Sequence, residues 1–341
     1  MYERYGNAAR IFFLSLVCVL CTGLLLSHGL MTGLEVKSPD RQRTSIAQGV
    51  LNISDNVDLV LLDVSVRRPH GGYVTGLSKD HFKISEDGYP RQITQFASVD
   101  TPVTVGLVVD NSGSMRSERP QVITAGLAFA KESNSRDQFF VVNFNNYVVR
   151  GLPFDMAFTD NLQTLRHALN YGDPSGQTAL YDAVAYALKH LELGRFEKRT
   201  LIVVSDGGDN VSRLRFPELM TLIESSRATI YTIGLLDPNN RELNPSVLKK
   251  MAAISGGEFF EPADESQIVP VFDRISKEIR NRYTIAYVPN ETTDRRLIRS
   301  VKVSAEENGR RLTVRTRRSY SIVPFADRIS ALDGTDQQGR K

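Results

Sequence analysis

The segment from Val103 to Met115, which reads VTVGLVVDNSGSM, decides the fold. Its apolar part has the length of a strand that is buried on both faces of a sheet. One carboxylate and two hydroxyls, from Asp110, Ser112 and Ser114, follow where this strand should end. Ligands of open α/β sheets bind beyond the carboxyl ends of the strands. The segment therefore predicts both a buried strand and a site at its end.

Strand-like and helix-like patterns alternate after this segment. The apolar runs of strand length lie at 138–144, 199–205 and 229–233. Apolar residues with helical spacing lie at 121–132, 180–191, 217–227, 245–254 and 268–280. Continuous apolar strands that alternate with helices indicate a doubly wound, mostly parallel sheet with helices on both faces. We therefore expect an α/β domain over residues 101–280.

Two β-rich segments, residues 57–100 and 281–323, flank this domain. Each alternates apolar and polar residues over short runs that are separated by turn residues such as Gly71-Gly72. Because a piece of two or three strands is only marginally stable alone, we expect both segments to pair into one small all-β sandwich into which the α/β domain is inserted. Two independent appendages are the alternative. Residues 324–341 are polar and are expected to form a flexible tail.

The N-terminal residues 1–34 are typical of a signal or membrane segment. Arg4 and Arg10 precede an apolar run from Ile11 to Leu26, and extension through Leu34 makes this run long enough to cross a membrane. No small-x-small cleavage site follows, which favours an uncleaved transmembrane helix over a cleaved signal peptide or a buried helix. Basic residues on both sides leave its orientation open. Residues 35–56 are the expected linker.

Composition excludes several classes of protein. The chain has 341 residues with 42 Lys+Arg against 39 Asp+Glu, a difference of +3, which excludes nucleic-acid binding through bulk basicity. Its only cysteines, Cys18 and Cys21, lie near the N-terminus, which excludes a disulfide scaffold. The sequence contains no G-x-S-x-G motif, P-loop or H-E-x-x-H motif. Its five histidines have no ligand-like spacing, so we expect them at the surface or in loops.

The oxygen-bearing residues after the first strand suit a hard cation. Mg²⁺ prefers oxygen ligands in octahedral geometry and keeps several waters. A tight turn through Gly113 could bring Asp110, Ser112 and Ser114 around one ion. Aspartate and serine are also ordinary turn and helix-capping residues, so this motif alone leaves a metal-free turn open.

Two further motifs extend this pattern. The run SGQTAL, residues 175–180, places a threonine in a loop before a helix, and VVSDGG, residues 203–208, places an aspartate at the end of a buried strand. In order, spacing and context, the three motifs resemble the metal-ion-dependent adhesion site of the von Willebrand factor type A domain. The resemblance covers about residues 101–280. It implies that one divalent cation, Mg²⁺ or else Mn²⁺ or Ca²⁺, is surrounded by Asp110, Ser112, Ser114, Thr178 and Asp206.

The flanks carry less specific motifs. The run GLSKDHF, residues 76–82, followed by Glu86-Asp87-Gly88, resembles the lead-in of a bacterial group of type A-related proteins common among acidobacteria. The run RYTIAY, residues 282–287, with a later RRSY, residues 317–320, resembles the tail of that group. No defined biochemical role follows from this likeness.

The resemblance implies a binding function. In the type A family, the cation keeps an open position that an Asp or Glu carboxylate of a partner protein fills. The first hypothesis is therefore a non-enzymatic binding protein that is membrane-anchored, or else secreted, outside the cytoplasm in the bacterial cell envelope, with no nucleic-acid partner. An assembly or maturation factor for a membrane complex is the first alternative. A metal-dependent hydrolase is weaker, because no general base lies beside the metal motif.

Other charged and apolar residues have simpler interpretations. We expect Asp173 and Asp209, which lie near the motifs, to be solvated loop carboxylates. The basic cluster Arg315, Arg317 and Arg318 is expected on the outward face of a strand. The last helix has one apolar stripe and leads directly into the returning β segment, so it could couple the metal site to the sandwich or act as a rigid strut. Its stripe consists of Ile268, Phe272, Ile275 and Ile279.

Overall fold

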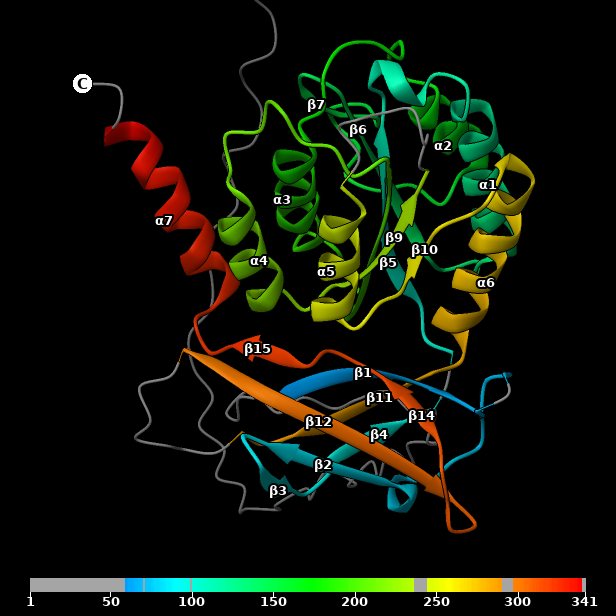
Figure 1. The fold of residues 1–341 in the computed structure, drawn as a ribbon, viewed down its shortest axis with the longest axis vertical. Coiled ribbons are helices and arrows are strands. Elements are labelled where there is room, and N and C mark those ends of the chain that lie inside the picture. Colours follow the sequence, from blue (N-terminus) through cyan, green and yellow to red (C-terminus); the bar gives the residue numbers. More distant parts are fainter. Residues whose placement is uncertain (1–58, 70, 99, 236–243, 290–296, 339–341) are drawn as a thin grey trace, which may run out of the picture. The chain divides into compact units, whose positions relative to one another are not determined.

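A computed structural model describes residues 59–338, apart from 70, 99, 236–243 and 290–296 (Figure 1). All of the described residues belong to one compact unit of the chain. The predicted signal anchor (1–34) and linker (35–56) lie outside the described residues. Among the helices that are described, none combines the length and the apolar character needed to cross a membrane.

A six-stranded sheet forms the centre of the α/β layer, in the order β10-β9-β8-β5-β6-β7. Its strands are parallel except for the edge strand β7, which runs antiparallel to β6. All residues of β5, β6 and β9 are buried, which is why these strands are nearly continuous apolar runs. The strands are β5 (Val103–Asp110), β6 (Gln138–Phe144), β7 (Val148–Arg150), β8 (Lys198–Ser205), β9 (Thr229–Gly234) and β10 (Phe259–Phe260).

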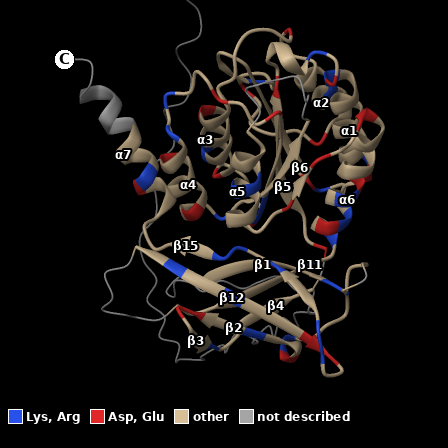
Figure 2. Cartoon of the chain, viewed as in Figure 1, with Lys and Arg blue, Asp and Glu red and all other residues tan. Residues whose placement is uncertain are grey.

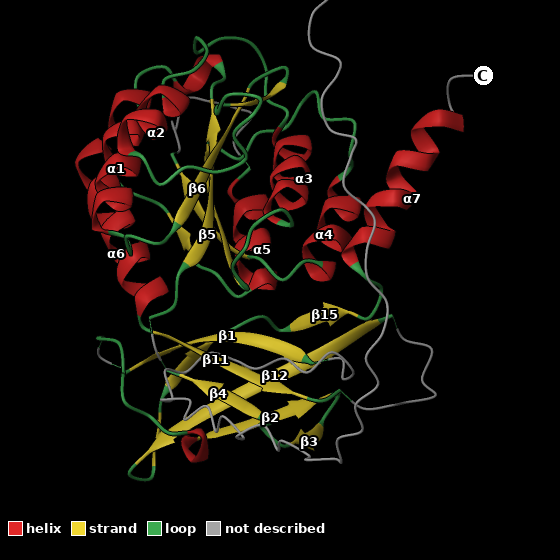
Figure 3. Ribbon diagram, turned by 180° about the vertical axis from the view of Figure 1, so that it is seen from behind, coloured by secondary structure: helices red, strands yellow, loops and turns green. Residues whose placement is uncertain are grey.

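Helices cover both faces of this sheet, which confirms the predicted α/β class. α1, α2 and α6 lie on one face, and α3, α4 and α5 lie on the other (Figure 3). The predicted stripe of α6 is buried, and its Phe272 packs edge-on against Phe129 of α1 with ring centroids 6.1 Å apart. The helices are α1 (Arg119–Glu132), α2 (Leu162–Leu169), α3 (Leu180–Leu191), α4 (Phe216–Ser225), α5 (Pro245–Ser255) and α6 (Ile268–Arg280).

The flanking segments form two sheets that pack into a sandwich. One sheet has the order β14-β1-β11-β4, and the other has the order β13-β12-β2-β3, with β15 also paired to β12. The first flank contributes β1 (Val60–Arg67), β2 (Phe82–Glu86), β3 (Tyr89–Arg91) and β4 (Gln95–Ala97). The second flank contributes β11 (Arg282–Tyr287), β12 (Ile298–Glu307), β13 (Arg310–Arg311), β14 (Thr313–Arg315) and β15 (Ser319–Ser321).

Strands from the two flanks pair with each other in both sheets. β1 is antiparallel to β11, with Leu62 opposite Ile285, and β2 is antiparallel to β12, with Ile84 opposite Val303. These residues and their neighbours form a separate apolar core, in which the rings of Phe82 and Tyr283 lie 5.1 Å apart. Neither flank could bury this core alone, because each of the two sheets around it contains strands from both ends of the described chain.

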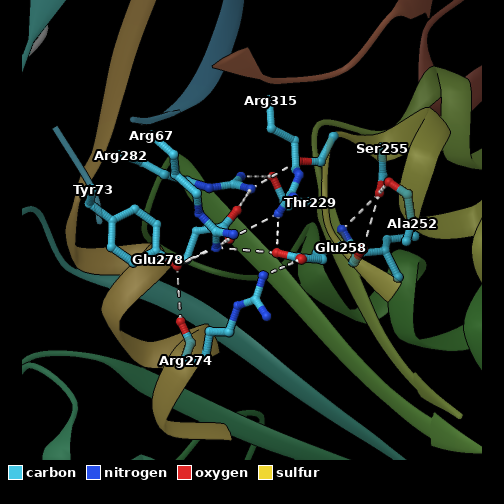
Figure 4. A network of polar contacts seen from close by, with 12 residues as sticks. Arg67, Tyr73, Thr229, Ala252, Ser255, Glu258, Arg274, Glu278, Arg282 and Arg315 are labelled. Carbon is cyan, nitrogen blue, oxygen red and sulfur yellow. Dashed lines mark hydrogen bonds and ion pairs between the residues drawn. The ribbon is translucent and has the colours of Figure 1, made fainter. Parts of the chain in front are cut away.

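A cluster of ion pairs, here called the joint network, connects the sandwich to the α/β layer (Figure 4). At its centre is Glu278 of α6, whose side chain is 0% exposed. Its carboxylate accepts hydrogen bonds from Arg67 at 2.8 Å, from Arg282 at 2.9 Å and from Arg315 at 3.1 Å. The three arginines belong to β1, β11 and β14, so one buried carboxylate holds three strands of a sandwich sheet.

Some elements differ from the sequence predictions. α2 and the short edge strands β7 and β10 were not anticipated. The alternating run over residues 91–96 does not form one strand but is divided between β3 and β4, and Tyr73 forms only an isolated bridge to Arg67. In short edge elements, pairing partners and burial outweigh local propensity.

The predicted flexible tail is also wrong for most of its length. Residues Phe325–Gln338 form helix α7. Phe325 is buried, and Ile329 and Leu332 pack against the core of the α/β layer. These three residues recur at helical spacing, but a polar composition concealed the stripe.

Candidate metal centre

Asp110 is fully buried at the end of β5, at the predicted site. Its Oδ1 accepts a hydrogen bond from the Ser112 amide at 2.8 Å, and its Oδ2 accepts one from Ser205 Oγ at 2.7 Å. Burial raises the pKa of Asp110 to about 6 against the effect of these hydrogen bonds, and the charge of Asp206 adds to the rise. Two neighbouring buried carboxylates are an arrangement that a bound cation stabilises.

The two serines and Asp206 form a chain of oxygens beside Asp110. Ser112 Oγ lies 3.0 Å from Ser114 Oγ, which donates a hydrogen bond to Asp206 Oδ2 at 2.8 Å. The short helical turn Gly113–Met115 places both hydroxyls on one side. Asp206 follows β8, the strand next to β5, so parallel pairing brings the two motifs to the same edge of the sheet. Ser114 is exposed, which leaves this edge open to solvent.

Thr178 reaches the same edge through its loop. Its amide donates to Asn210 Oδ1 at 2.9 Å, and its carbonyl accepts from the Asn210 amide at 3.0 Å. One turn earlier, Gly176 accepts a hydrogen bond from the Gly113 amide at 3.2 Å, which joins the threonine loop to the serine turn. Gly176 has φ +83° and faces Asn146 so closely that a Cβ would overlap it, so this turn requires glycine.

The spacing of the oxygens is that of ordinary hydrogen bonds, and it is also the spacing of neighbouring ligands around a small octahedral cation. With Mg–O bonds of about 2.1 Å, neighbouring ligands in an octahedron lie about 3.0 Å apart. The Ser112–Ser114 and Ser114–Asp206 oxygen pairs are separated by 3.0 and 2.8 Å. Among the residues that the structure describes, no group of three or more His, Cys, Asp or Glu is arranged to hold a metal. An ion at this edge would therefore depend on hydroxyl ligands as well as carboxylates.

Sequence reasoning missed two residues that position the centre. Ser205 Oγ bridges the centre, because it donates to Asp110 and accepts from the Gly207 amide at 3.0 Å. Asn146, between β6 and β7, accepts a hydrogen bond from the Gln177 amide at 2.9 Å and so holds the threonine loop. Ser205 could have been found, since it directly precedes Asp206 at a strand end. Asn146 has no comparable signal in the sequence.

The predictions that Asp209 is a solvated loop carboxylate and that His190 lies at the surface or in a loop are wrong. Asp209 is half-buried and accepts hydrogen bonds from the Tyr181 amide at 2.8 Å and from Ser212 Oγ at 2.6 Å, so it satisfies the first turn of α3. Burial raises its pKa. His190 is buried within α3 and donates to the carbonyl of Ala157 at 2.8 Å. Burial lowers the pKa of His190, which packs in the core, whereas Asp209 caps the start of α3.

The predicted outward basic cluster is wrong for two of its three members. Arg315 belongs to the joint network, and Arg317 is 9% exposed and donates to the carbonyl of Ser226 at 2.6 Å. Arg318 is exposed. In Figure 2, the basic segment between β14 and β15 lies between the sandwich and the α/β layer. These two arginines are not solvated, because this face of the strand meets the α/β layer.

Comparison with known proteins gives one family match. Residues 105–208 match the von Willebrand factor type A domain family. No curated protein matches the chain. The likeness of the flanks to an acidobacterial group stays a prediction.

Solved structures show limited similarity to the chain. A von Willebrand factor type A protein from Catenulispora acidiphila is 13% identical with a TM-score of 0.48, covering 79% of this chain and 75% of that one. The vWF domain of the type V pili tip protein Mfa5 from Porphyromonas gingivalis is 16% identical with a TM-score of 0.42, covering 53% and 96%. An aerotolerance-related membrane protein from Bacteroides fragilis is 14% identical with a TM-score of 0.43, covering 52% and 98%.

Proposed function

We propose that this protein, whose residues 105–208 match the von Willebrand factor type A domain family, binds a partner protein through a divalent cation, Mg²⁺ or else Mn²⁺ or Ca²⁺. The cation would be held by Asp110, Ser112, Ser114, Thr178 and Asp206. The observation that carries the proposal is the chain of oxygens from Ser112 through Ser114 to Asp206, whose spacing suits an octahedral ion.

The residues of the proposed centre have different roles. When bound, the cation supplies positive charge and an open coordination position to a carboxylate of the partner. Ser205 and the Ser112 amide keep the Asp110 carboxylate oriented at the end of β5. Ser114 stands at the exposed edge, where a partner can approach. The proposal is therefore of a binding module rather than an enzyme.

Exposed aromatic residues near the centre support a protein partner. Tyr147 is 75% exposed and follows Asn146, which holds the threonine loop. Tyr171 is 56% exposed, and its carbonyl accepts a hydrogen bond from Asn111 of the metal motif at 3.2 Å. Tyrosine is enriched among the residues that dominate protein interfaces. A partner that reaches the cation with an Asp or Glu would contact these rings as well.

The remaining parts of the proposal concern location. The apolar run within residues 1–34 is proposed to anchor the protein in the membrane, with the domains outside the cytoplasm in the bacterial cell envelope. Assembly of a membrane complex remains an alternative use of the same site.

Asp110→Ala tests the centre directly. We expect the variant to lose Mg²⁺ and Mn²⁺ binding in calorimetric titration while its far-UV circular dichroism is unchanged, because the carboxylate lies at the end of the strand. Asp155→Ala, which removes an exposed carboxylate, should bind the metal like the wild type. Unchanged metal binding in Asp110→Ala would refute the site. Partner capture that resists EDTA would refute metal-dependent recognition, and metal-dependent turnover of a captured partner would refute the non-enzymatic role.

A further inference from the structure

A cavity of about 340 Å³ lies between the sandwich and the α/β layer. Leu61, Asp63 and Thr284 of strands β1 and β11 line it on one side. Lys198 and Thr229, which begin β8 and β9, line it on the other. The cavity therefore lies at the amino ends of the parallel strands. Its volume falls within the range of small-molecule sites.

Lys198 is a buried cation that lines this cavity. It is 8% exposed, and within the described part of the chain no hydrogen bond or ion pair reaches its ammonium group. Burial lowers the pKa of Lys198, although the charges of Asp63 and Asp100 oppose this effect. A buried charge without a partner is costly, so a cavity that contains one is suited to an anion.

The other lining residues also favour an anion. The cavity is lined by five basic residues and two acidic ones, and 5 − 2 gives +3. Arg317, the second buried cation, donates through Nη2 to the carbonyls of Ser226 at 2.6 Å and of Ile223 at 3.5 Å, which are neutral acceptors. Asp63 already accepts a hydrogen bond from Thr284 Oγ1 at 3.1 Å. The basic residues are Arg136, Arg195, Lys198, Arg227 and Arg317, and the acidic residues are Asp63 and Glu197.

The apolar lining residues indicate that the rest of the ligand is apolar. Leu61, Ala97, Pro102 and Phe196 line the same cavity. At roughly 30 Å³ for each water, the volume corresponds to about a dozen waters or a compact organic molecule of similar size. We propose that this cavity binds a small organic anion, a carboxylate or phosphate on a compact apolar body, whose charged group pairs with Lys198 and Arg317.

This site is separate from the metal centre. Asp206 lies eight positions after Lys198 along and just past β8, which at about 3.3 Å per residue places them about 26 Å apart. A ligand in the cavity would contact both the sandwich and the α/β layer, so its binding should stabilise the folded protein by mass action. Anion binding should not respond to EDTA, which distinguishes a failure of this inference from a failure of the proposed metal site.

Phenyl phosphate, benzoate and the neutral control phenol test the inference on the full chain in a zwitterionic detergent. We expect saturable calorimetric binding of at least one anion and a rise in Tm that phenol does not produce. Lys198→Met, which keeps the length of the side chain without its charge, should weaken anion binding at least tenfold. Lys302→Met, at an exposed position on β12, should leave it unchanged. Addition of EDTA should alter neither result.

A second variant guards against misfolding of Lys198→Met. Arg227→Gln changes an exposed residue at the cavity and should weaken anion binding about threefold. The inference is overturned if phenol binds as tightly as the anions, or if neither anion binds at 10 mM. It is also overturned if folded Lys198→Met retains wild-type affinity. If Lys198→Met does not fold, unchanged affinity in Arg227→Gln overturns it instead.

Discussion

Glu278→Gln should destabilise the protein strongly, although it changes only one atom. The carboxylate is 0% exposed and accepts hydrogen bonds from three arginines, Arg67, Arg282 and Arg315. Glutamine keeps the shape but removes the charge, and its amide N–H groups face arginine donors. Arg282, which is 4% exposed on its side chain, would lose the carboxylate that neutralises it.

The expected cost follows from the burial of this pair. Removing one partner of a buried ion pair costs about 3–5 kcal/mol. Arg282 keeps its hydrogen bonds to Thr229 and Gly256, and Glu258 remains beside Arg67, so we expect the lower end of this range. At about 2–4 °C for each kcal/mol in a chain of this size, Tm should fall by about 6–12 °C.

The effect should depend on pH in a defined direction. Burial alone would raise the pKa of Glu278, but the charges of Arg282, Arg315 and Arg67 outweigh it, so the pKa is lowered in the folded protein. A carboxylate with a lowered pKa stabilises the fold fully above its unfolded pKa of about 4.3. That stabilisation disappears as the pH falls through the folded pKa. The difference between wild type and variant should therefore persist at pH 6–8 and shrink below about pH 4.3.

Urea unfolding followed by far-UV circular dichroism measures this difference. Asp273→Asn is the matched control, because Asp273 lies on the same helix and pairs with Lys277 at the surface. That exposed pair should contribute far less, because solvent screens its charges. A loss below 1 kcal/mol in Glu278→Gln, or a loss equal to that of Asp273→Asn, would refute the argument that burial makes this pair important.

Three further changes test other parts of the structure. Phe272→Ala should cost about 3–5 kcal/mol in urea unfolding, because it leaves a cavity against Phe129, and should leave calorimetric Mg²⁺ affinity within twofold. Gly256→Ala should lower the free energy of unfolding by about 1–3 kcal/mol, because φ is +83° and the new Cβ would meet the Arg317 backbone. Gly309→Ala is the control, because its φ is +74° but the space around it is open, so it should show the backbone strain alone. Removal of residues 1–34 should move the protein from the membrane pellet to the supernatant. If the truncated protein still sediments with the membrane, the predicted anchor is wrong.

The parallel core was predictable because its signal is local. The apolar runs of β5, β8 and β9 and the apolar stripe of α6 can be read directly from the sequence. The spacing of apolar residues within each element indicates both its type and its buried face. The motifs around Asp110 and Asp206 were found because they directly follow such strands. Residues that hold the motif loops, such as Asn146, were missed because their partners lie far away in the chain.

The joint between the two domains could not be predicted from local patterns. Arg67 and Glu278 are 211 residues apart in the chain, and nothing near either residue indicates the other. The same reason explains the error over Arg315 and Arg317, whose strand meets the α/β layer. Charged residues in a sequence normally predict an exposed surface. They predict a buried interface only when the residue that pairs with them is known.

The joint network favours one of the two roles that the sequence left open for α6. A shift of α6 by one turn, about 5.4 Å, would carry Glu278 away from Arg67 and Arg315, which belong to the sandwich. Losing a buried partner costs about 3 kcal/mol, so a ligand that drives the shift must prefer the shifted state more than a hundredfold. This cost favours a rigid strut. If α6 nevertheless moves, Glu278→Gln should lower the barrier and raise partner affinity at the metal centre. Equal affinity in the folded variant and the wild type would establish that α6 only packs.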